Sequence, residues 1–378
     1  MKMEKIQLHT VIYSGKNALD RLKSFNDKRV FIVADPFIIE SNIIEEIKSR
    51  LKVGQNEWKV FSDIVPDPPV ENVVAGVQEI AAFKPDLVVT IGGGSAIDAA
   101  KAMKEFASKI YNYEKLPLIA VPTTSGTGSE VTSFSIITDS SKGVKYPLVA
   151  DSLLPEEAIL DTELVQSVPK TITADTGMDA LTHAIEAYVA TNANEFSDAL
   201  AEKAIRLIFD YLPEAYHDGN NAIAREKMHQ ASTMAGIAFN AAGLGINHSI
   251  AHACGAKFHI PHGRLNAILL PEVILYNAGL EGYLNTDLNP AADKYAYLAQ
   301  MLRLPATNSA IGTRSLIKSI EKLRSGLGMP ADFKGYDIEY TEAVKVDIAR
   351  SALQDSCTNT NPIQPKNEDI VAILANLR

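Results

Sequence analysis

Asp86-Leu87-Val88-Val89-Thr90-Ile91-Gly92-Gly93-Gly94-Ser95 is the stretch that decides the fold of this chain. Its first six residues are mostly apolar and β-branched, as in a strand buried inside a parallel sheet. The glycines and the serine then predict a tight turn, and Ala96–Lys109 has the pattern of a helix. Strand, glycine-rich turn and helix make up the repeating part of the βαβ unit from which doubly wound sheets are built.

The sequence on either side repeats this alternation of short β-branched runs and helical patterns. The neighbouring predicted elements are Val30–Ala34, Lys59–Phe61 and Leu116–Val121 as strands, and Ala75–Phe83 as a helix. Such alternation indicates a Rossmann-like parallel sheet covered by helices. From about Pro169 onward strand signals become rare and amphipathic helical periods prevail. We therefore predict an α/β domain over residues 1–168 and an all-helical domain over residues 169–378.

The glycine run after the clearest strand is a candidate phosphate site. Gly93 and Gly94 have no side chain to block a ligand, backbone N–H groups at a helix start attract phosphate, and Ser95 can add a hydroxyl. A second loop, Thr123–Ser129, follows the next strand and is rich in small hydroxyl residues. Loops after neighbouring parallel strands share the sheet edge where α/β folds bind ligands. These loops predict a dinucleotide site, with tight turns or a plain surface loop as the alternatives.

Asp35 stands at the carboxyl end of an early predicted strand. A carboxylate in this place can accept hydrogen bonds from a ribose 2′-hydroxyl and would repel a 2′-phosphate, which favours NAD over NADP. The alternative is that Asp35 caps the N-terminus of a helix.

The second half of the chain carries a carboxylate and imidazoles at helical spacings. Asp179 and His183 are four residues apart, as are His248 and His252, so each pair shares one face of a helix. His262 follows on a separate segment. Taken singly, each histidine is more often a core or surface residue than a ligand. Together they suit Fe²⁺ or Zn²⁺ held with one coordination position open.

Composition and charge limit the kinds of protein this can be. The net charge of −10 argues against nucleic acid or an anionic membrane as a partner. Two cysteines among 378 residues argue against a disulfide scaffold and suit a reducing cytosol. The first residues lack the apolar core of a signal peptide, and no apolar run is long enough to cross a bilayer. We therefore expect a soluble, cytoplasmic protein.

Taken together, the motifs resemble the iron-dependent (group III) alcohol dehydrogenases over nearly the whole chain. They are Gly92–Ser95, Pro122–Thr132, Asp179 with His183, His248 with His252, and Pro261-His262-Gly263. Further segments are similar to the branch of that family that acts on 1-propanol in propanediol utilisation: Ala231–Gly236, Gly243–His252, Gly143–Leu148 and Thr360–Pro362.

The resemblance implies a dinucleotide-binding N-terminal domain and an all-α metal-binding C-terminal domain, in a dehydroquinate synthase-like architecture with the active site in the cleft. Its metal ligands would be Asp179, His183, His248 and His262, and His252 would lie near the nicotinamide. The positions that would contact the cofactor are Asp35, Asp67, Gly93, Gly94, Ser95, Asp98, Thr123, Thr124, Thr127 and Lys145.

The resemblance also implies the reaction. An NAD(H)-dependent enzyme would interconvert short primary alcohols and aldehydes, with propanal and 1-propanol favoured. Fe²⁺, or Zn²⁺, would act as Lewis acid, hydride would pass to or from the nicotinamide, and His252 would help the proton leave. A homo-oligomer, dimer or higher, is expected, and so is an association with the enzymes of a bacterial microcompartment.

Three other functions are considered. Within the family, the chain could be a 1,3-propanediol or a lactaldehyde/1,2-propanediol oxidoreductase. A metal-dependent synthase of the dehydroquinate synthase kind is more remote, because the helical half shows no basic cluster for an anionic substrate. A non-catalytic binding subunit is disfavoured, because the metal donors and the nucleotide loop are both intact.

Overall fold

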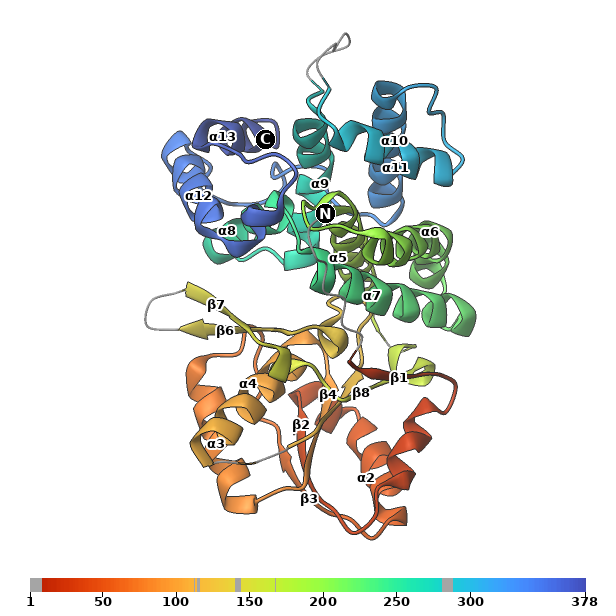
Figure 1. Cartoon of the computed structure of the whole chain (residues 1–378), viewed down its shortest axis with the longest axis vertical. Helices are drawn as coiled ribbons and strands as arrows, with labels where there is room; N and C mark the ends of the chain where they lie inside the picture. Colours follow the sequence, from red (N-terminus) through yellow and green to blue (C-terminus); the bar gives the residue numbers. More distant parts are fainter. Residues whose placement is uncertain (1–8, 112, 114–115, 140–143, 167, 281–287) are drawn as a thin grey trace. The chain divides into compact units, whose positions relative to one another are not determined.

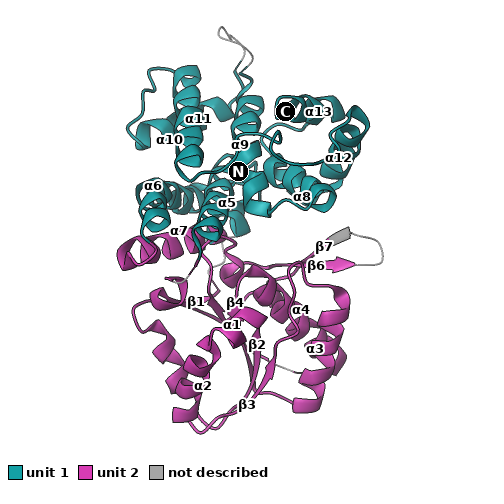
Figure 2. Cartoon of the chain, turned by 180° about the vertical axis from the view of Figure 1, so that it is seen from behind, with its two compact units in different colours: residues 1–6, 169–218, 237–378 teal, residues 7–168, 219–236 magenta. Residues whose placement is uncertain are grey.

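The computed structural model describes residues 9–111, 113, 116–139, 144–166, 168–280 and 288–378. The chain divides into two compact units, coloured separately in Figure 2. The first, here called the α/β unit, is Gln7–Val168 with Gly219–Gly236, and the second, the helical unit, is Met1–Ile6, Pro169–Asp218 and Ile237–Arg378. The division into continuous domains 1–168 and 169–378 stays a prediction, and residues 219–236 pack with the α/β unit.

The α/β unit is built on a six-stranded parallel sheet in the order β1-β8-β5-β4-β2-β3 (Figure 1). Its strands are β1 (Val11–Gly15), β2 (Arg29–Ala34), β3 (Glu57–Phe61), β4 (Leu87–Gly92), β5 (Leu118–Pro122) and β8 (Glu157–Asp161). The order reverses between β2 and β4, because β3 lies on one side of this pair and β5 and β8 on the other. The carboxyl ends of strands at such a reversal are where doubly wound folds bind ligands.

Helices cover both faces of this sheet, as the continuous apolar runs of its central strands predict. On one face, Phe31 and Val33 pack with Val77 and Ile80 of α3 (Val70–Phe83) and with the alanines of α4 (Gly94–Tyr111). On the other face, the alternate strand residues pack with η1 (Ala18–Ser24), α1 (Pro36–Glu40) and α2 (Ile43–Val53). The predicted Rossmann-like fold class is confirmed.

The α/β unit also has elements that the sequence did not predict. An antiparallel hairpin of β6 (Phe134–Asp139) and β7 (Val144–Val149) leaves the second glycine-rich loop. The edge strand β1 and its neighbour β8, which lies between β1 and β5, were not anticipated either. The short 3₁₀ turns are η2 (Ser129–Val131), η3 (Asp151–Leu153) and η4 (Thr162–Val165).

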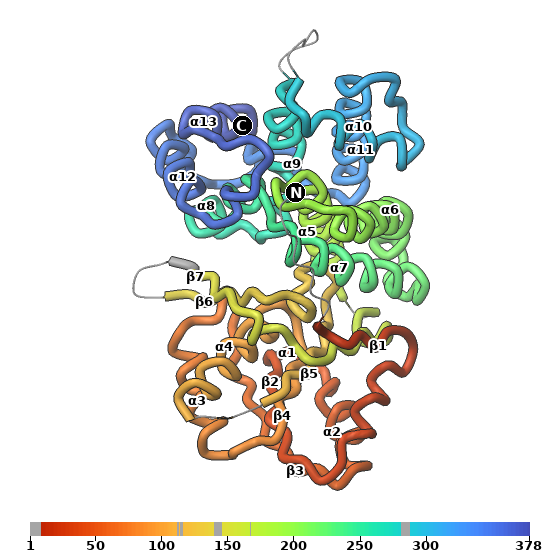
Figure 3. The backbone as a smooth tube through the Cα atoms, viewed as in Figure 1, coloured from red at the N-terminus to blue at the C-terminus, as the bar shows by residue number. Residues whose placement is uncertain are grey.

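The helical unit contains no strand among its described residues. Its helices are α5 (Lys170–Val189), α6 (Glu195–His217), α8 (Ile246–Phe258), α9 (His262–Ala278), α10 (Ala291–Met301), α11 (Ser309–Gly326), α12 (Glu342–Gln354) and α13 (Asn367–Ala375), with η5 (Ser356–Thr360). Helix α7 (Ala222–Ala242) belongs to both units, which divide after Gly236. Figure 3 traces α8 beside α12 and α13, which share one apolar core with α9. Within the described residues, no helix is long and apolar enough to span a bilayer.

A buried lysine ties α4 to the loop that follows β5. The Lys101 side chain is fully buried and donates from Nζ to the carbonyls of Thr132 (2.8 Å) and Phe134 (2.7 Å). Burial lowers the pKa of Lys101 to about 8, and the nearby carboxyl groups of Asp98 and Glu130 oppose this shift. Lys101 therefore fixes the path of the chain between the second loop and the hairpin.

Replacing Lys101 with Met tests this role. The carbonyls of Thr132 and Phe134 would each lose the hydrogen bond from Lys101, at roughly 1–3 kcal/mol each. We expect the melting temperature of the α/β unit to fall by roughly 5–15 °C in differential scanning calorimetry. The control is Lys23→Met on η1, which removes only an exposed ion pair with Asp20. If the two variants had the same melting temperature, Lys101 would not hold this loop.

Candidate active site

The two glycine-rich loops leave the sheet side by side. Strands β4 and β5 are neighbours in parallel register, with Gly92 opposite Pro122, and the Thr123 amide donates to the Gly92 carbonyl at 2.9 Å. The next strand on the other side is β2, where Ala34 lies opposite Ile91. The residues that follow β2, β4 and β5 are therefore brought to one edge, as expected from the sequence.

Gly93 and Gly94 differ in how closely the second loop packs on them. A Cβ on Gly94 would lie 2.7 Å from Cγ2 of Thr127, so this glycine is needed for packing. A Cβ on Gly93 would meet nothing closer than Thr124 at 3.6 Å, an ordinary contact distance. Because α4 begins at Gly94, the space beside Gly93 lies at the start of a long helix. N–H groups at a helix start favour an anion, so the phosphate site predicted here stays a prediction.

Asp35 is the N-cap of a helix and also lies beside the glycine run; its contact with a ribose stays a prediction. Its Oδ1 accepts from the Ile38 amide at 3.1 Å and so caps α1. Its Oδ2 lies over the glycine run, 2.6 Å from the position that a Cβ on Gly92 would take. Gly92 has a φ of +151°, which also favours glycine. One carboxylate oxygen of Asp35 therefore holds the helix while the other faces the loop.

The remaining positions expected at the cofactor differ in how they are placed. Both oxygens of Asp98 are bonded internally, Oδ1 by the Ser129 hydroxyl at 2.5 Å and Oδ2 by the Ile136 amide at 3.0 Å. Burial raises the pKa of Asp98, and its bonds hold the second loop. Asp67 has a left-handed φ of +53° in the loop after β3. Lys145 is on β7, but its side chain lies outside the described part of the structure.

Gly93→Ala tests the phosphate site. The added methyl group meets no protein atom closely, so we expect a melting temperature within about 2 °C of wild type. It would occupy the space over the start of α4, so NADH binding should weaken about tenfold or more, measured by NADH fluorescence. Gly326→Ala is the control, because its Cβ also meets nothing within 4 Å but lies at the end of α11. Equal NADH affinity in the two variants would contradict the site.

In the helical unit, α5 presents three chemically active side chains on one face. Asp179, His183 and Glu186 follow one another at spacings of four and three residues, which place them on the same side of a helix. All three are buried. His183 stacks on the His248 ring with centroids 4.5 Å apart, and on Phe239 at 4.6 Å.

Three of the four predicted ligands come together as a close group of donor atoms. Donor atoms of Asp179, His248 and His262 all lie within 4.8 Å of one another. Asp179 Oδ1 is 3.7 Å from His248 Nε2 and 3.4 Å from His262 Nε2. Ligands about 2.1 Å from a tetrahedral ion would be about 3.4 Å apart. These spacings therefore fit a divalent cation, with His183 beside the group.

The acceptor atoms of this group converge on one donor, the Asn266 side chain. Its Nδ2 lies 2.6 Å from Asp179 Oδ1 and 3.1 Å from Nε2 of both His248 and His262. Asn247 Nδ2 donates to the other end of this amide, Asn266 Oδ1, at 2.8 Å, which sets its orientation. Convergence of a carboxylate oxygen and two imidazole nitrogens on one point is the arrangement that a cation requires.

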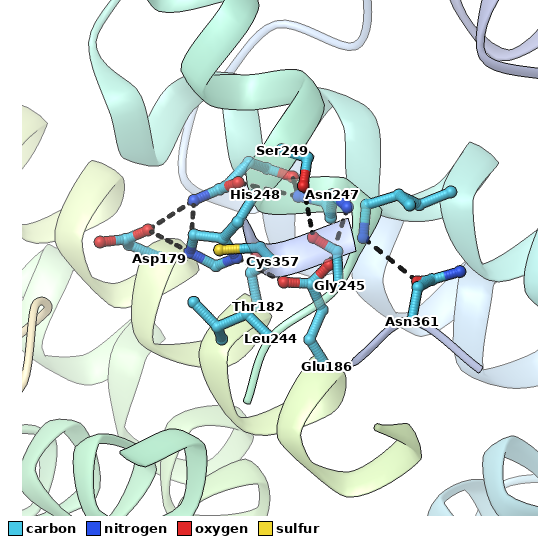
Figure 4. Close-up of polar contacts among 12 residues, drawn as sticks. Asp179, Thr182, Glu186, Leu244, Gly245, Asn247, His248, Ser249, Cys357 and Asn361 are labelled. Carbon is cyan, nitrogen blue, oxygen red and sulfur yellow. Dashed lines mark hydrogen bonds and ion pairs between the residues drawn. The ribbon is translucent and has the colours of Figure 1, made fainter. Parts of the chain in front are cut away.

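Glu186 orients the central imidazole from behind. Figure 4 shows His248 between Asp179 and Glu186, with Nδ1 bonded to Glu186 Oε2 and Nε2 facing Asp179. Burial alone would lower the pKa of His248, but Glu186 and Asp179 raise it to about 9. A carboxylate behind a histidine fixes its tautomer and makes it a more basic metal ligand. Glu186 also accepts from the Asn247 amide at 2.7 Å, at the start of α8.

Electrostatics keep the carboxylate of this group ionised. Burial would raise the pKa of Asp179, but the imidazoles of His183, His262 and His248 lower it below its ordinary value. The carboxylate is therefore charged at neutral pH, as a metal ligand must be.

His252 lies next to the close group and is held by a second carboxylate. Its ring stacks on His262 with centroids 5.2 Å apart, and its Nδ1 bonds to Asp355 Oδ2 at 2.9 Å. Asp355 also accepts from the Cys357 amide at 2.8 Å. Burial would raise the pKa of Asp355, but the bond with His252 lowers it. His252 Nε2 is consequently the ring nitrogen left for other partners.

Sequence reasoning missed Glu186, Asn266 and Asp355. Helical spacing could have found the first two, because Glu186 is seven residues after Asp179 and Asn266 is four after His262. No local signal connects Asp355 with His252, since 103 residues separate them.

Comparison with known proteins identifies the family. The model of iron-containing alcohol dehydrogenases matches residues 9–162, and the model of the C-terminal part of the Fe-containing alcohol dehydrogenase family matches residues 173–377. The chain belongs to the iron-containing alcohol dehydrogenase family. It is 45% identical to a 1-propanol dehydrogenase PduQ of Citrobacter freundii over 95% of this chain and 96% of that protein. Against PduQ of Salmonella typhimurium identity is 44%, over 98% of both chains.

A solved structure agrees with this assignment. The crystal structure of a 1,3-propanediol oxidoreductase superposes over the full length of both chains with a TM-score of 0.90 and 32% identity. The predicted resemblance is thus confirmed, and this family member is a metal-dependent alcohol dehydrogenase.

Glu186→Gln tests the support of His248. The amide keeps the size of the side chain but removes the charge behind the imidazole. We expect metal affinity to fall roughly 10- to 100-fold, measured by competition with a chelator and elemental analysis. Glu272→Gln on α9 is the control, because Glu272 bonds only Asn376 at the surface among the contacts described. Equal metal retention by the two variants would mean that Glu186 does not support a metal ligand.

Proposed function

We propose that this alcohol dehydrogenase holds Fe²⁺ and uses NAD(H) to interconvert propanal and 1-propanol, mainly as an aldehyde reductase. The observation that carries the proposal is the convergence of Asp179, His248 and His262 at the spacing of metal ligands. His183, beside them on α5, completes the proposed ligand set. Three imidazoles and a carboxylate suit Fe²⁺ and also Zn²⁺, so Zn²⁺ is the second candidate.

The two bound groups would supply the reactive chemistry. A divalent ion provides Lewis acidity toward the substrate oxygen, and the nicotinamide exchanges hydride with the substrate carbon. The protein holds these groups and handles the proton. Asp179 and the three imidazoles would bind the divalent ion. Glu186 orients His248 by the bond to Nδ1, and Asn266 donates a hydrogen bond to Asp179.

The cofactor would be held at the sheet edge of the α/β unit. The proposed phosphate contacts are Gly93, Gly94, Ser95, Thr123, Thr124 and Thr127, which surround the start of α4. Asp35 would accept from the ribose hydroxyls with its Oδ2, which excludes a 2′-phosphate and favours NAD. Asp67 and Lys145 complete the proposed cofactor positions. Asp98 would act by holding the second loop, because both of its oxygens are already bonded.

His252 is the proposed proton carrier. Asp355 bonds to Nδ1, which leaves Nε2 to accept the proton of the substrate hydroxyl or of a water next to it. In the reductive direction the same nitrogen would return the proton. An Asp–His pair of this kind fixes the tautomer of the base.

The substrate proposal rests on the relatives named 1-propanol dehydrogenase, which match at 44–45% identity over almost the whole chain. The alternative is oxidation and reduction of a diol, because a structural neighbour at 32% identity is a 1,3-propanediol oxidoreductase. Lactaldehyde/1,2-propanediol is the other diol pair. We also propose a cytoplasmic homo-oligomer, dimer or higher, associated with the enzymes of a bacterial microcompartment.

Anaerobic chelation followed by metal add-back tests the proposed reaction. We expect NADH oxidation with propanal to disappear with the chelator and return with Fe²⁺ or Zn²⁺, while Asp179→Asn stays inactive and holds little metal. Relative kcat/KM values for propanal, lactaldehyde and 3-hydroxypropanal then rank the substrates. Activity that survives removal of all metal would overturn the proposal.

His252→Ala separates proton transfer from metal binding. We expect kcat to fall by roughly 10²–10⁴-fold with metal content unchanged. Asp355→Asn should give a smaller loss of kcat, because His252 remains but its tautomer is no longer fixed. Loss of metal from His252→Ala would make this residue a ligand instead.

A further inference from the structure

One face of α7 packs along the second nucleotide loop within the α/β unit. His229, Thr233 and Gly236 are spaced by four and three residues on this helix. Thr233 donates to Glu130 Oε1 at 2.6 Å, and Gly236 lies so close to Gly128 that a Cβ on it would be 2.9 Å from the Gly128 Cα. Close packing explains the contact between Gly236 and Gly128, and the hydrogen bond from Thr233 satisfies the buried carboxyl group of Glu130.

His229 makes the third contact, with the Ser125 hydroxyl, and packing does not explain it. The ring is 2% exposed, and Nδ1 lies 3.0 Å from Ser125 Oγ. The other nitrogen, Nε2, is buried and has no hydrogen-bond partner among the described residues. Burial lowers the pKa of His229 to about 4, so the ring is neutral at neutral pH. A leucine would fill this space without burying an unbonded polar atom.

The unbonded nitrogen indicates which tautomer is present. If Ser125 donated to Nδ1, the proton of His229 would sit on Nε2 and a buried N–H would lack an acceptor. Orphaned buried N–H groups are rarer than under-satisfied acceptors. The favoured tautomer therefore has its proton on Nδ1 and donates to Ser125 Oγ. The hydroxyl proton of Ser125 is then free to be donated to a ligand.

A serine nucleophile with a histidine base is the competing interpretation of this pair. Such a base has its second nitrogen oriented by a further group, whereas His229 Nε2 has no such partner among the described side chains. A ring with a pKa of about 4 is also a weak base at neutral pH. The geometry therefore favours a donor role for Ser125 over a nucleophilic one.

The place of Ser125 in the loop indicates which part of a ligand it would meet. It directly follows Thr124, which is the nearest residue to the open side of Gly93. Two residues later, Thr127 packs on Gly94 at the start of α4. The Ser125 hydroxyl is therefore attached to the loop that borders the phosphate site.

We propose that His229 is a positioning residue that orients the Ser125 hydroxyl to donate to the pyrophosphate of the bound dinucleotide. The proposal rests on the proposed use of NAD(H). It adds to the cofactor site one donor from the loop and one buried residue of α7 that acts through it. Neither residue belongs to the expected cofactor positions.

ADP-ribose, which has the pyrophosphate but no nicotinamide, is the probe for the contact. Ser125→Ala should weaken ADP-ribose and NADH binding equally, by about tenfold, in isothermal titration calorimetry. Adenosine, which lacks phosphate, should bind both proteins alike. A loss for NADH alone would place the hydroxyl at the nicotinamide end, and no loss for either ligand would remove the contact; both results overturn the proposal.

Variants of His229 test the positioning role. His229→Leu removes the donor and should weaken ADP-ribose binding about fivefold, whereas His229→Asn can place its amide nitrogen where Nδ1 lies and should stay within about twofold of wild type. The double variant Ser125→Ala/His229→Leu should bind no more weakly than Ser125→Ala, because the two residues act through one hydroxyl. If the double variant lost ADP-ribose affinity by the product of the two single losses, the two residues would act independently and His229 would have a structural role only.

The melting temperature of each variant, measured with and without ligand, shows whether the variant is folded. If His229→Leu does not fold, His229→Asn and Ser125→Ala still test the contact, because they keep a similar shape or delete one oxygen. A wild-type protein that binds neither NADH nor ADP-ribose would refute the proposed function itself. Normal binding and turnover, with all variants equal to wild type, would refute the inference alone.

Discussion

The hydrogen bond from the Thr123 amide to the Gly92 carbonyl is the constraint on which the nucleotide side of this protein depends. It closes the ladder between β4 and β5, so both strands end at the same level. Two loops of small residues must then leave the sheet together, and β2 brings Asp35 to their side. Lys101 and Asp98 bond the second loop to α4, and Thr233 bonds it to α7.

In the helical unit, the candidate site is formed where the faces of three helices meet. Helix α5 carries Asp179, His183 and Glu186, α8 carries His248 and His252, and α9 carries His262 and Asn266. Each pair or triplet is spaced by three or four residues, so a few side chains from three helices meet at one point. The charge of Asp179 and the basicity of His248 follow from these neighbours, since burial alone would shift both pKa values the other way.

Local pattern was sufficient for the centre of the fold and for the donor atoms of the site. Strands β2, β4 and β5 were predicted because strands covered on both faces are continuous apolar runs. The edge strands have half-exposed residues that blur this pattern, so β1 was missed and only the last three residues of β3 were predicted. Helical spacing singled out Asp179 and His248, whereas His262 was noted on a separate segment and joined the ligand set through the resemblance to the family. Glu186, Asn266 and Asp355 were missed because their roles depend on partners 18 to 103 residues away.

The division of α7 between the units has a consequence for how the chain is made. Residues 219–236 supply the face on which Ser125–Glu130 packs, yet they are synthesised after the first helices of the other unit. A nascent chain that has reached Val168 has its whole parallel sheet but not this helix. Because domains generally fold as units during synthesis, the nucleotide loop can reach its final packing only after about fifty helical-unit residues have been added. The α/β unit thus matures together with its neighbour, not ahead of it.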